Sequence, residues 1–316
     1  MARASESTTA PLEDFRTIGR RVSNWGRWGA DDERGTLNLV TPDRLVEAAR
    51  LVRAGKTFAL GIPFDGDGPQ DGRVRGNPQR MMKETAARSH GSPGAFRYAD
   101  DCVFMALQAA SQWDSLAHVH YDGLLYNGFP ASDVDVTGAA HCAVSNLSPG
   151  VVGRGVLLDV ARRQGVDWLP AGTAILPEDL DEAAAAHGVE VREGDVLLVR
   201  TGWRRKFLAD GDKAGFKAGE PGLSIRCADW LHERGVAAVG SDNFAIEVLP
   251  GEYDDEYLPL HMVALRDMGM PLAEILDLED LADDCASDGV HEFLFTGPPL
   301  SFTRGVGSPV NPLALK

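Results

Sequence analysis

One short segment holds most of the residues in this sequence that could carry out chemistry. Its amides are Gln108 and Gln112, its acid is Asp114, and its imidazole is His118. Residues an even number apart share one face of an extended chain, so the two amides and the acid converge if a strand persists there. A carboxylate and an imidazole held close together can bind a metal ion, or can act as a base and its orienting partner. The same residues could instead be satisfied core amides and an acid that caps a turn.

A second candidate cluster lies in the last third of the chain. His261 is followed by Glu274 in a predominantly apolar neighbourhood. Neutral imidazole is the commonest protein metal ligand, and carboxylate is a usual companion. A lone histidine in such a setting more often packs in the core. Asp242, at the end of a predicted strand, is a further acid without an assigned role.

Two aromatic residues flank the first cluster. Trp113 and Tyr121 could line a pocket and favour a ring-bearing substrate, or they could simply pack in the core. Ser111 and Ser115 also lie near His118. Neither stands in a Gly-x-Ser-x-Gly turn, so the sequence gives little support to a nucleophilic serine.

The elements around these residues alternate between strand-like and helix-like patterns. Thr41 and Pro42 predict the start of a helix that Gly55 ends. Such alternation favours an α/β architecture. The predicted strands are 103–107, which we expect to run into the interior, 151–160, 195–203 and 236–240, and the predicted helices are 178–186 and 224–234.

The segment 64–99 has almost no periodicity. A loop this long in a compact domain is usually a lid or a subunit-crossing arm, or else it is disordered. We predict one domain over residues 13–316, containing 64–99 as a long loop or arm, after a disordered tail over residues 1–12.

Composition narrows the classes of partner. The chain has 316 residues and a formal net charge of −16, so it should repel both nucleic acid and anionic membranes. The polar start of the sequence leads us to expect no signal peptide, and the absence of an apolar run of roughly 18 residues, the length of a membrane span, predicts no membrane-spanning helix. Four widely spaced cysteines without a CxxC motif indicate reduced thiols in a cytoplasmic protein. The sequence contains neither a GxGxxG motif nor a P-loop, so it gives no support to a nucleotide cofactor.

Several stretches, in this order, resemble the metal-dependent cyclase family, which includes kynurenine formamidase and isatin hydrolase. The usual fingerprint of that family is His-x-Gly-Thr-His-x-Asp-x-Pro-x-His. The aligned segment here, over residues 108–118, is Gln-Ala-Ala-Ser-Gln-Trp-Asp-Ser-Leu-Ala-His. The other matching stretches are Asn-Trp-Gly-Arg-Trp-Gly at 24–29, Gly-Arg-Gly-Val-Leu-Leu-Asp at 153–159, Gly-Asp-Val-Leu-Leu-Val-Arg-Thr-Gly-Trp at 194–203, Gly-Ser-Asp at 240–242 and Gly-Val-Gly-Ser-Pro at 305–309.

The resemblance implies a swivelling β/β/α fold with a mixed sheet core, peripheral helices and an N-terminal arm that crosses between subunits of a homodimer or homotetramer. It also implies a mononuclear or binuclear zinc or manganese site. Carried over position by position, Asp114 is a metal ligand, His118 is the general base, and His261 and Glu274 are ligands of the second metal. Glu274 lies one residue further from His261 than the family pattern places it.

This sequence departs from the fingerprint at two positions. Gln108 and Gln112 stand where the family has its first two metal-binding histidines. A glutamine carbonyl is a neutral, hard donor that binds zinc more weakly than imidazole does. The change shifts the expected ion towards manganese, magnesium or calcium, or removes the site. Gln112 is retained as a candidate ligand.

We therefore expect a hydrolase that cleaves a C–N or C–O bond of a small cyclic or N-acyl amide, lactam or lactone. A divalent ion would activate water, with His118 as general base and Asp114 beside it. The expected substrate-contacting residues are Trp113, Tyr121, Gln108 and Gln112. One alternative is a metal-independent cyclase, dehydratase or isomerase that uses Asp114 and His118 as an acid–base pair. Another is a non-catalytic protein that binds a small molecule.

Overall fold

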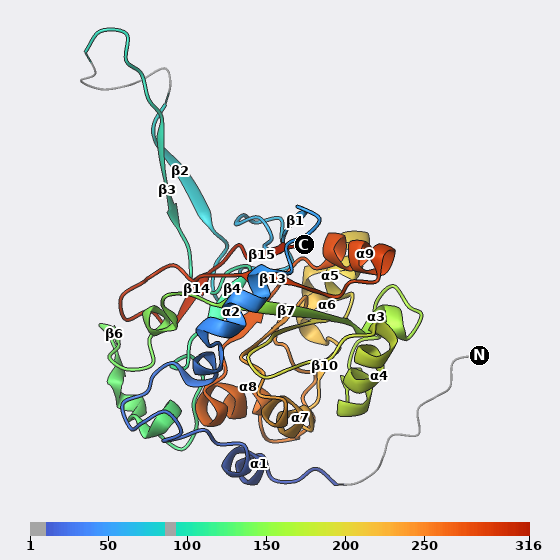
Figure 1. Ribbon diagram of the computed structural model, residues 1–316. Helices are drawn as coiled ribbons and strands as arrows, with labels where there is room; N and C mark the ends of the chain where they lie inside the picture. The colour runs from blue at the N-terminus through green and yellow to red at the C-terminus, as the bar shows by residue number, and fades with distance from the viewer. Residues whose placement is uncertain (1–10, 86–92) are drawn as a thin grey trace.

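The computed structural model describes residues 11–85 and 93–316, so the predicted tail lies, except for its last two residues, outside the described part. A nine-stranded mixed sheet runs through the centre (Figure 1). Its strands in spatial order are β1 (Thr57–Ala59), β15 (Leu313–Leu315), β13 (Glu292–Thr296), β7 (Val152–Asp159), β9 (Val196–Arg200), β11 (Ala238–Ser241), β12 (Leu272–Glu274), β4 (Gln112–Asp114) and β14 (Gly307–Pro309). The strands from β7 to β12 pair in parallel, and the flanking strands pair antiparallel. This mixed α/β arrangement confirms the predicted fold class.

Alternating residues of the central strands bury both faces of the sheet. Val156 and Leu158 of β7 belong to one apolar cluster, whereas Leu157 between them belongs to another. Because successive side chains of a strand point to opposite faces, the sheet must be covered on both sides. One face packs against α4 (Pro177–His187), α7 (Cys227–Glu233), α8 (Pro259–Met262) and a π-helical turn (Val263–Met268), and the other packs against α9 (Glu279–Asp288).

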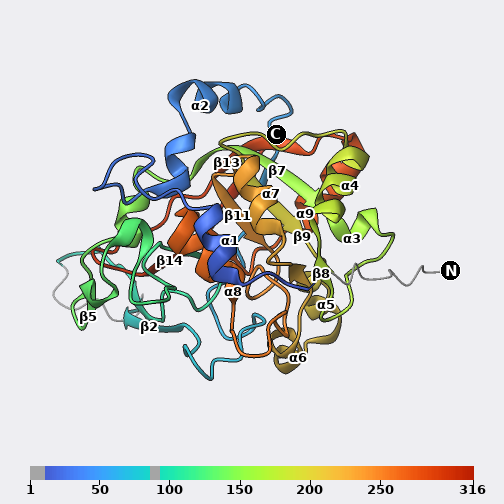
Figure 2. The ribbon, with the colours of Figure 1, turned by 90° about the horizontal axis from the view of Figure 1, so that it is seen from below.

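Further elements surround this core, as Figure 2 shows from below. Two small sheets are formed by β8 (Ala174–Ile175) with β10 (Gly222–Leu223), and by β5 (Val134–Asp135) with β6 (Gly138–Ala139). The remaining helices are α1 (Phe15–Arg21), α2 (Pro42–Ala49), α3 (Val160–Arg163), α5 (Trp203–Asp210) and α6 (Lys213–Ala218), with 3₁₀ turns at Gly35–Leu39, Tyr126–Gly128, Ala131–Asp133 and Val144–Leu147.

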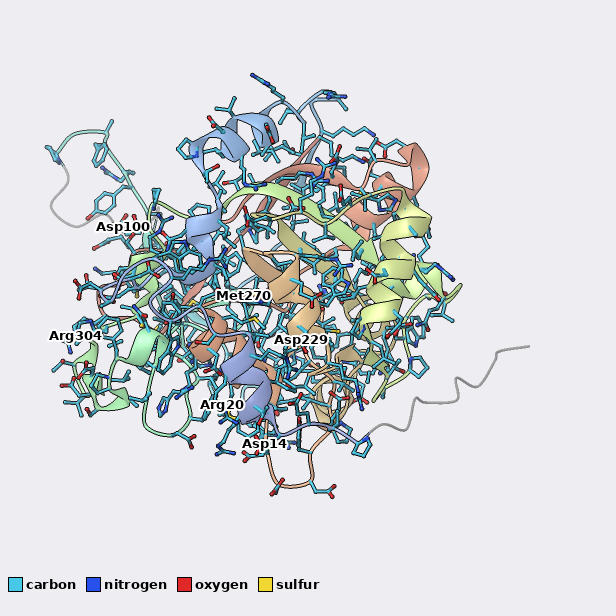
Figure 3. The ribbon with its side chains drawn as sticks, turned by 60° about the horizontal axis from the view of Figure 1, so that its bottom comes forward. Asp14, Arg20, Asp100, Asp229, Met270 and Arg304 are labelled. Carbon is cyan, nitrogen blue, oxygen red and sulfur yellow. The ribbon has the colours of Figure 1, made fainter. Side chains whose placement is uncertain are left out.

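The N-terminal helix α1 fastens the start of the chain to the underside of the molecule. The Asp14 side chain caps it by accepting a hydrogen bond from the backbone N–H of Arg16. Figure 3 labels Asp14 at the start of this helix, Arg20 within it and Asp229 of α7 nearby. Arg21 forms an ion pair with Asp229, with nitrogen and oxygen 2.7 Å apart, so two distant parts of the sequence are joined here.

The helix predicted from Thr41 is present as α2, but it is shorter than expected. Thr41 caps it and Pro42 is its first residue, as the sequence predicts. It ends at Ala49 rather than near Gly55, because the N–H of Arg50 closes the last turn and the chain then bends towards β1. Its apolar side chains are only partly buried: Leu45 is 39% exposed.

The prediction of an interior strand at residues 103–107 is wrong. β3 (Asp100–Phe104) pairs with β2 (Gln79–Glu84) in a hairpin that projects from the body of the protein (Figure 1). Val103 is 56% exposed and Phe104 is 74% exposed. An apolar run predicts a strand, but it does not reveal whether that strand enters the core. The segment 64–99 therefore contains one strand of a projecting arm, and residues 86–92 lie outside the described part.

Two further sequence features can be compared with the structure. Cys142, Cys227 and Cys285 are buried, Cys102 is exposed on the arm, and all four are free thiols. Within the described ranges, no helix is both long enough and apolar enough to cross a bilayer.

Candidate active site

The antiparallel pairing of β4 with β12 sets out the acids of the candidate site. Gln112 lies opposite Glu274, and its amide Nε2 donates hydrogen bonds to Glu274 Oε2 at 2.5 Å and to Asp114 Oδ1 at 3.4 Å. Gln112 and Asp114 are two positions apart and therefore share one face of the strand. All three side chains are buried. The sheet thus holds two acids and an amide in one place, although Gln112 and Glu274 are 162 residues apart in the chain.

His261 joins this group from helix α8. Its Nε2 lies 2.9 Å from Glu274 Oε1, and its Nδ1 lies 2.8 Å from Glu247 Oε1. Glu247 also accepts hydrogen bonds from the backbone N–H groups of Leu260 and His261, so the ring is held on both sides. Burial alone would lower the pKa of His261, but the two glutamates outweigh it and raise that pKa to about 10. The imidazole is therefore positively charged in this arrangement.

The carboxyl group of Glu274 responds to the same surroundings. Burial and the neighbouring charge of Asp114 raise its pKa to about 7, while His261 opposes them. Its two oxygens are shared between His261 and Gln112. Asp114 is less satisfied, because its Oδ2 is buried and has no hydrogen-bond partner in the described part of the chain. A buried carboxylate oxygen without a donor is costly unless something positive binds it.

His118 stands at the open side of the group. Its side chain is 21% exposed, and its Nε2 lies 3.7 Å from Asp114 Oδ1. Its Nδ1 lies 3.1 Å from the amide Nε2 of Gln108, so in this arrangement the Gln108 N–H donates to an unprotonated Nδ1. Burial lowers the pKa of His118, and the charges of Arg75 and His261 lower it further against the pull of Asp114. The ring is thus a neutral imidazole with an acid on one side and an amide on the other.

The residues assembled here fit a divalent metal ion. One ligand atom from each of Asp114, His261 and Glu274 lies within 4.8 Å of the others, and all three residues are buried. The Oδ2 of Asp114 is a further possible metal-ligand atom, because it accepts no hydrogen bond from the described residues. Two carboxylates and one imidazole suit manganese or magnesium as well as zinc. Binding would require His261 to lose its proton, as metal-binding histidines do.

The side-chain amide of Gln112, which the sequence predicts as a metal ligand, is oriented by a cation and two acids. Its carbonyl oxygen accepts a hydrogen bond from Arg75 Nη1 at 3.3 Å, so its amide nitrogen faces the two acids. This orientation follows from charge, since a cation attracts the carbonyl and carboxylates attract the N–H groups. Gln112 is a hydrogen-bond donor to both acids in this arrangement, and its role as a metal ligand stays a prediction.

The two aromatic candidates do not join the cluster. Trp113 points to the opposite face of β4, is fully buried, and donates its indole N–H to the carbonyl of Gly297 at 2.7 Å. Tyr121 packs in the core and donates its hydroxyl to Asp267 at 2.8 Å. Both side chains are thus engaged within the fold, and their contact with substrate stays a prediction.

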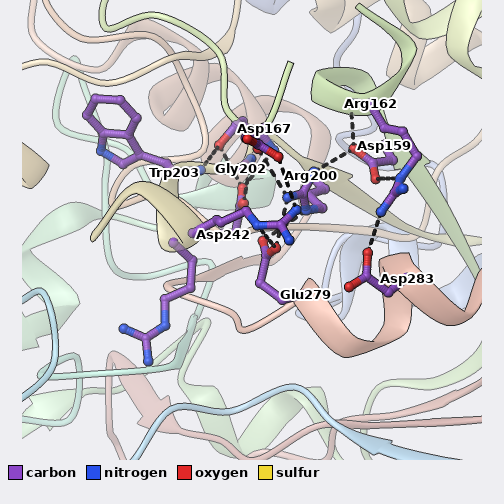
Figure 4. A network of polar contacts seen from close by, with 12 residues as sticks. Asp159, Arg162, Asp167, Arg200, Gly202, Trp203, Asp242, Glu279 and Asp283 are labelled. Atoms are coloured by element: carbon purple, nitrogen blue, oxygen red, sulfur yellow. Dashed lines mark hydrogen bonds and ion pairs between the residues drawn. The ribbon is translucent and has the colours of Figure 1, made fainter. Parts of the chain in front are cut away.

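Asp242 belongs to a network of polar contacts around the turn that follows β9 (Figure 4). Its carboxylate accepts hydrogen bonds from the backbone N–H groups of Thr201 and Gly202, each at 2.8 Å. Arg200, which precedes this turn, bridges Asp159 and Glu279. Burial raises the pKa of Asp242 to about 6. This acid fixes the turn after β9 and has no contact with His261 or Glu274.

Sequence reasoning missed two residues of the site. Glu247 orients His261, and Arg75 donates to Gln112 and, at 2.8 Å, to the carbonyl of Gln108. Both lie in segments without regular secondary structure, where neither spacing nor periodicity marks them. Only the fold brings them to the cluster.

Comparisons with known proteins agree with this geometry. The family model named Cyclase matches residues 41–248. A crystal structure described as that of a novel cyclase is 38% identical, covers 97% of this chain and 100% of its own, and has a TM-score of 0.89. A search of curated proteins finds no match.

More distant structures share the fold. Isatin hydrolase A from Labrenzia aggregata, solved with benzyl benzoate, is 19% identical, with coverage of 86% of this chain and 97% of its own and a TM-score of 0.61. A protein from Bacillus stearothermophilus described as a predicted metal-dependent hydrolase is 17% identical, with coverage of 83% and 98% and a TM-score of 0.52. Because the family model spans more than half of the sequence and the 38% identical structure aligns along nearly all of it, the chain belongs to the cyclase family.

Proposed function

We propose that this protein is a hydrolase that opens a cyclic or N-acyl amide, lactam or lactone with the help of a divalent metal ion. One observation carries the proposal: the buried group Asp114, His261 and Glu274, with ligand atoms within 4.8 Å, adjoins the partly exposed His118. Related structures described as isatin hydrolase and as a metal-dependent hydrolase support it. Isatin contains a five-membered lactam, which is one of the proposed substrate classes.

In this proposal, one set of residues binds the ion and another residue transfers the proton. Asp114, His261 and Glu274 would hold the ion, which when bound supplies positive charge that polarises a carbonyl and lowers the pKa of water. Glu247 fixes the His261 ring through Nδ1, so that Nε2 is the nitrogen turned towards Glu274. A fixed ring orientation lowers the cost of assembling the site.

His118 would move the proton. In the structure the Gln108 N–H faces Nδ1, so this step requires the amide to turn over; its carbonyl then accepts a hydrogen bond from Nδ1–H, and the Nε2 lone pair is free on the side of Asp114. Nε2 takes a proton from the attacking water while the oxygen of that water bonds to the substrate carbonyl carbon. As the C–N or C–O bond then breaks, His118 returns the proton to the departing nitrogen or oxygen. Asp114, 3.7 Å away, stabilises the imidazolium in between.

The test is hydrolysis with controlled metal content. The purified protein would be stripped with a chelator and then supplied with manganese, zinc or magnesium. It would be assayed on isatin, on an N-acyl aniline and on an aryl lactone. We expect ring opening or deacylation that is lost on stripping and restored by one of the ions. Unchanged turnover in the stripped protein would contradict the metal-dependent proposal.

One observation favours a second candidate function, a metal-independent acid–base enzyme. The charged His261 ring lies between Glu247 and Glu274 and already offsets part of the negative charge of this group without an ion. Asp114 and His118 would then act as an acid–base pair in cyclisation, dehydration or isomerisation. Turnover that resists chelation and needs His118 would favour this candidate. Ligand binding without turnover, in both stripped and metal-loaded protein, would instead favour a non-catalytic member of the family.

A further inference from the structure

A narrow pocket adjoins the candidate site. Gln108, which contacts His118, forms part of its wall. Arg75 from the segment that precedes the arm and Lys217 from α6 bring two positive charges to the same wall, next to the ring of Phe244. The pocket is thus joined to the proposed proton-transfer residue through one shared side chain.

Among the described residues the two cations form no direct ion pair, although the charge of Arg75 acts on the buried Glu274, in a chain with a net charge of −16. Within residues 11–85 and 93–316, neither Arg75 nor Lys217 forms a salt bridge. Arg75 donates hydrogen bonds only from Nη1, to the backbone carbonyl of Gln108 and the side-chain carbonyl of Gln112. Its Nε and Nη2 make no hydrogen bond to the described residues. Asp71 also lines the pocket, but its carboxylate faces Arg73 at 3.9 Å.

Phe244 holds the two charges in place without neutralising them. Lys217 Nζ lies 4.8 Å from the centre of the Phe244 ring, and the Arg75 guanidinium carbon lies 5.8 Å from it. The backbone of Phe244 is itself fixed, because its N–H donates to the buried Glu220 at 2.8 Å. The pocket has a volume of about 20 Å³, room for little more than one water molecule, so the two cations beside this ring match the small charged head of a ligand, such as a carboxylate.

We infer that Arg75 and Lys217 bind a carboxylate on the substrate, so that the substrate class is a carboxylate-bearing amide, lactam or lactone. The free Nε and Nη2 edge of a guanidinium matches the two oxygens of a carboxylate, and the lysine adds a point charge. This inference rests on the proposed function for the identity of the reacting bond. Arg75 is linked to the Asp114–Glu274 group through Gln112, which accepts from Arg75 and donates to Glu274.

Binding of simple probes tests the anion site without any turnover. Metal-free protein would be titrated with benzoate and with its neutral isostere benzamide. We expect benzoate to bind at least about tenfold more tightly, because charge-assisted hydrogen bonds are roughly twice as strong as neutral ones. Arg75→Met and Lys217→Met should each weaken benzoate binding by about tenfold and leave benzamide unchanged. Arg73→Met is the matched control, since Arg73 is two residues from Arg75 and 81% exposed.

Each outcome has a defined meaning. Equal binding of benzoate and benzamide, or benzoate affinity that survives both substitutions, overturns the inference. Thermal unfolding of each variant separates a lost anion site from a lost fold, and Lys217→Met leaves the Arg75–Gln112 bond untouched. Because the titration needs neither metal nor catalysis, its failure is distinguishable from failure of the proposed function.

A kinetic comparison separates substrate from product. Metal-loaded protein would be assayed on acetanilide and on its ortho-, meta- and para-carboxylates. We expect at least one carboxylate to have a kcat/KM about tenfold or more above that of acetanilide, with the advantage lost in Lys217→Met. Benzoate binding without any such preference would assign the cations to the product carboxylate and overturn the substrate class named here.

Discussion

Gln112 and Glu274 face each other across β4 and β12, with the amide nitrogen 2.5 Å from the carboxylate oxygen. The amide occupies a position between Asp114 and Glu274 where an electron-pair donor would complete a metal site. The structure therefore keeps two acids together by giving them an N–H donor, while His261 supplies positive charge from the other side.

Replacing that amide by imidazole should strengthen zinc binding. Gln112→His would put a soft nitrogen donor next to Asp114 and Glu274, and imidazole is a far better zinc ligand than an amide carbonyl. We expect zinc affinity, measured by competition with a chromophoric chelator, to rise at least about tenfold. Gln79→His, on the exposed arm, is the control. If the variant and the parent compete equally with the chelator, the Asp114–Glu274 group is not a metal site.

Removing the proposed proton carrier should slow turnover without loosening the fold. His118→Ala is expected to lower kcat by roughly 100- to 10,000-fold, the range typical of general acid–base catalysis. Metal content should stay the same, because His118 is not one of the three grouped ligands. His120→Ala offers a matched control, since His120 is exposed and two residues away. Comparable activity of the two variants would remove His118 from the mechanism.

A single added methyl group should test whether Gln108 positions His118. A Cβ built on Gly307 would lie only 2.4 Å from Gln108 Nε2, and its other close neighbours are also atoms of the Gln108 side chain. Gly307→Ala should therefore push the amide off His118 and lower kcat by about tenfold, with little change in the free energy of unfolding.

The double variant supplies the control for this prediction. In Gly307→Ala/Gln108→Ala the clash is gone, so its kcat should equal that of Gln108→Ala alone. If Gly307→Ala instead lowers activity by the same factor in both backgrounds, the methyl group acts through something other than Gln108.

A stacked histidine pair far from the site should make stability depend on pH. The rings of His187 and His291 lie 4.0 Å apart and nearly parallel. Burial and the neighbouring His187 lower the pKa of His291 from 6.5 to about 4. Between pH 6.5 and 4 the unfolded chain therefore binds a proton at this position that the folded protein does not. Folding stability should fall as the pH drops through that range and stay constant, as far as His291 is concerned, above it.

Chemical unfolding at pH 7 and about pH 4.5 would measure this loss. A tenfold change in proton affinity corresponds to about 1.4 kcal/mol, so the stability lost through His291 by about pH 4.5 is on the order of 2 kcal/mol. His291→Phe keeps a flat ring beside His187 and should lose less stability on acidification than the parent does. His120→Ala, which removes an exposed histidine, should behave like the parent. An equal loss in all three proteins would contradict the prediction.

The sequence predicted the elements whose patterns are local. The apolar run that became β9 and the Thr41–Pro42 start of α2 depend on neighbouring residues alone, and both are present. The prediction for residues 103–107 was wrong because it also rested on a local pattern alone. Their pattern indicates a strand, but only long-range packing decides whether a strand lies in the core or in an arm.

The candidate site divides in the same way. The resemblance to a known fingerprint indicated Asp114, His118, His261 and Glu274, and the fold brings them together. Glu247 could not be found, because its hydrogen bonds to His261 depend on how a loop passes α8. The sequence also could not show that Trp113 lies on the face of β4 opposite Gln112 and Asp114 and donates to the carbonyl of Gly297, because all three residues of this short strand are buried.

The position of β4 between β12 and β14 also limits how far the protein can fold while it is being translated. A ribosome makes Gln112 and Asp114 early, yet the strand that carries Glu274 and the one that closes the other edge emerge only near the end of translation. Until then, the edges of the nascent β4 segment have no permanent hydrogen-bond partners. No amino-terminal fragment that stops before β12 can assemble the acid–imidazole group.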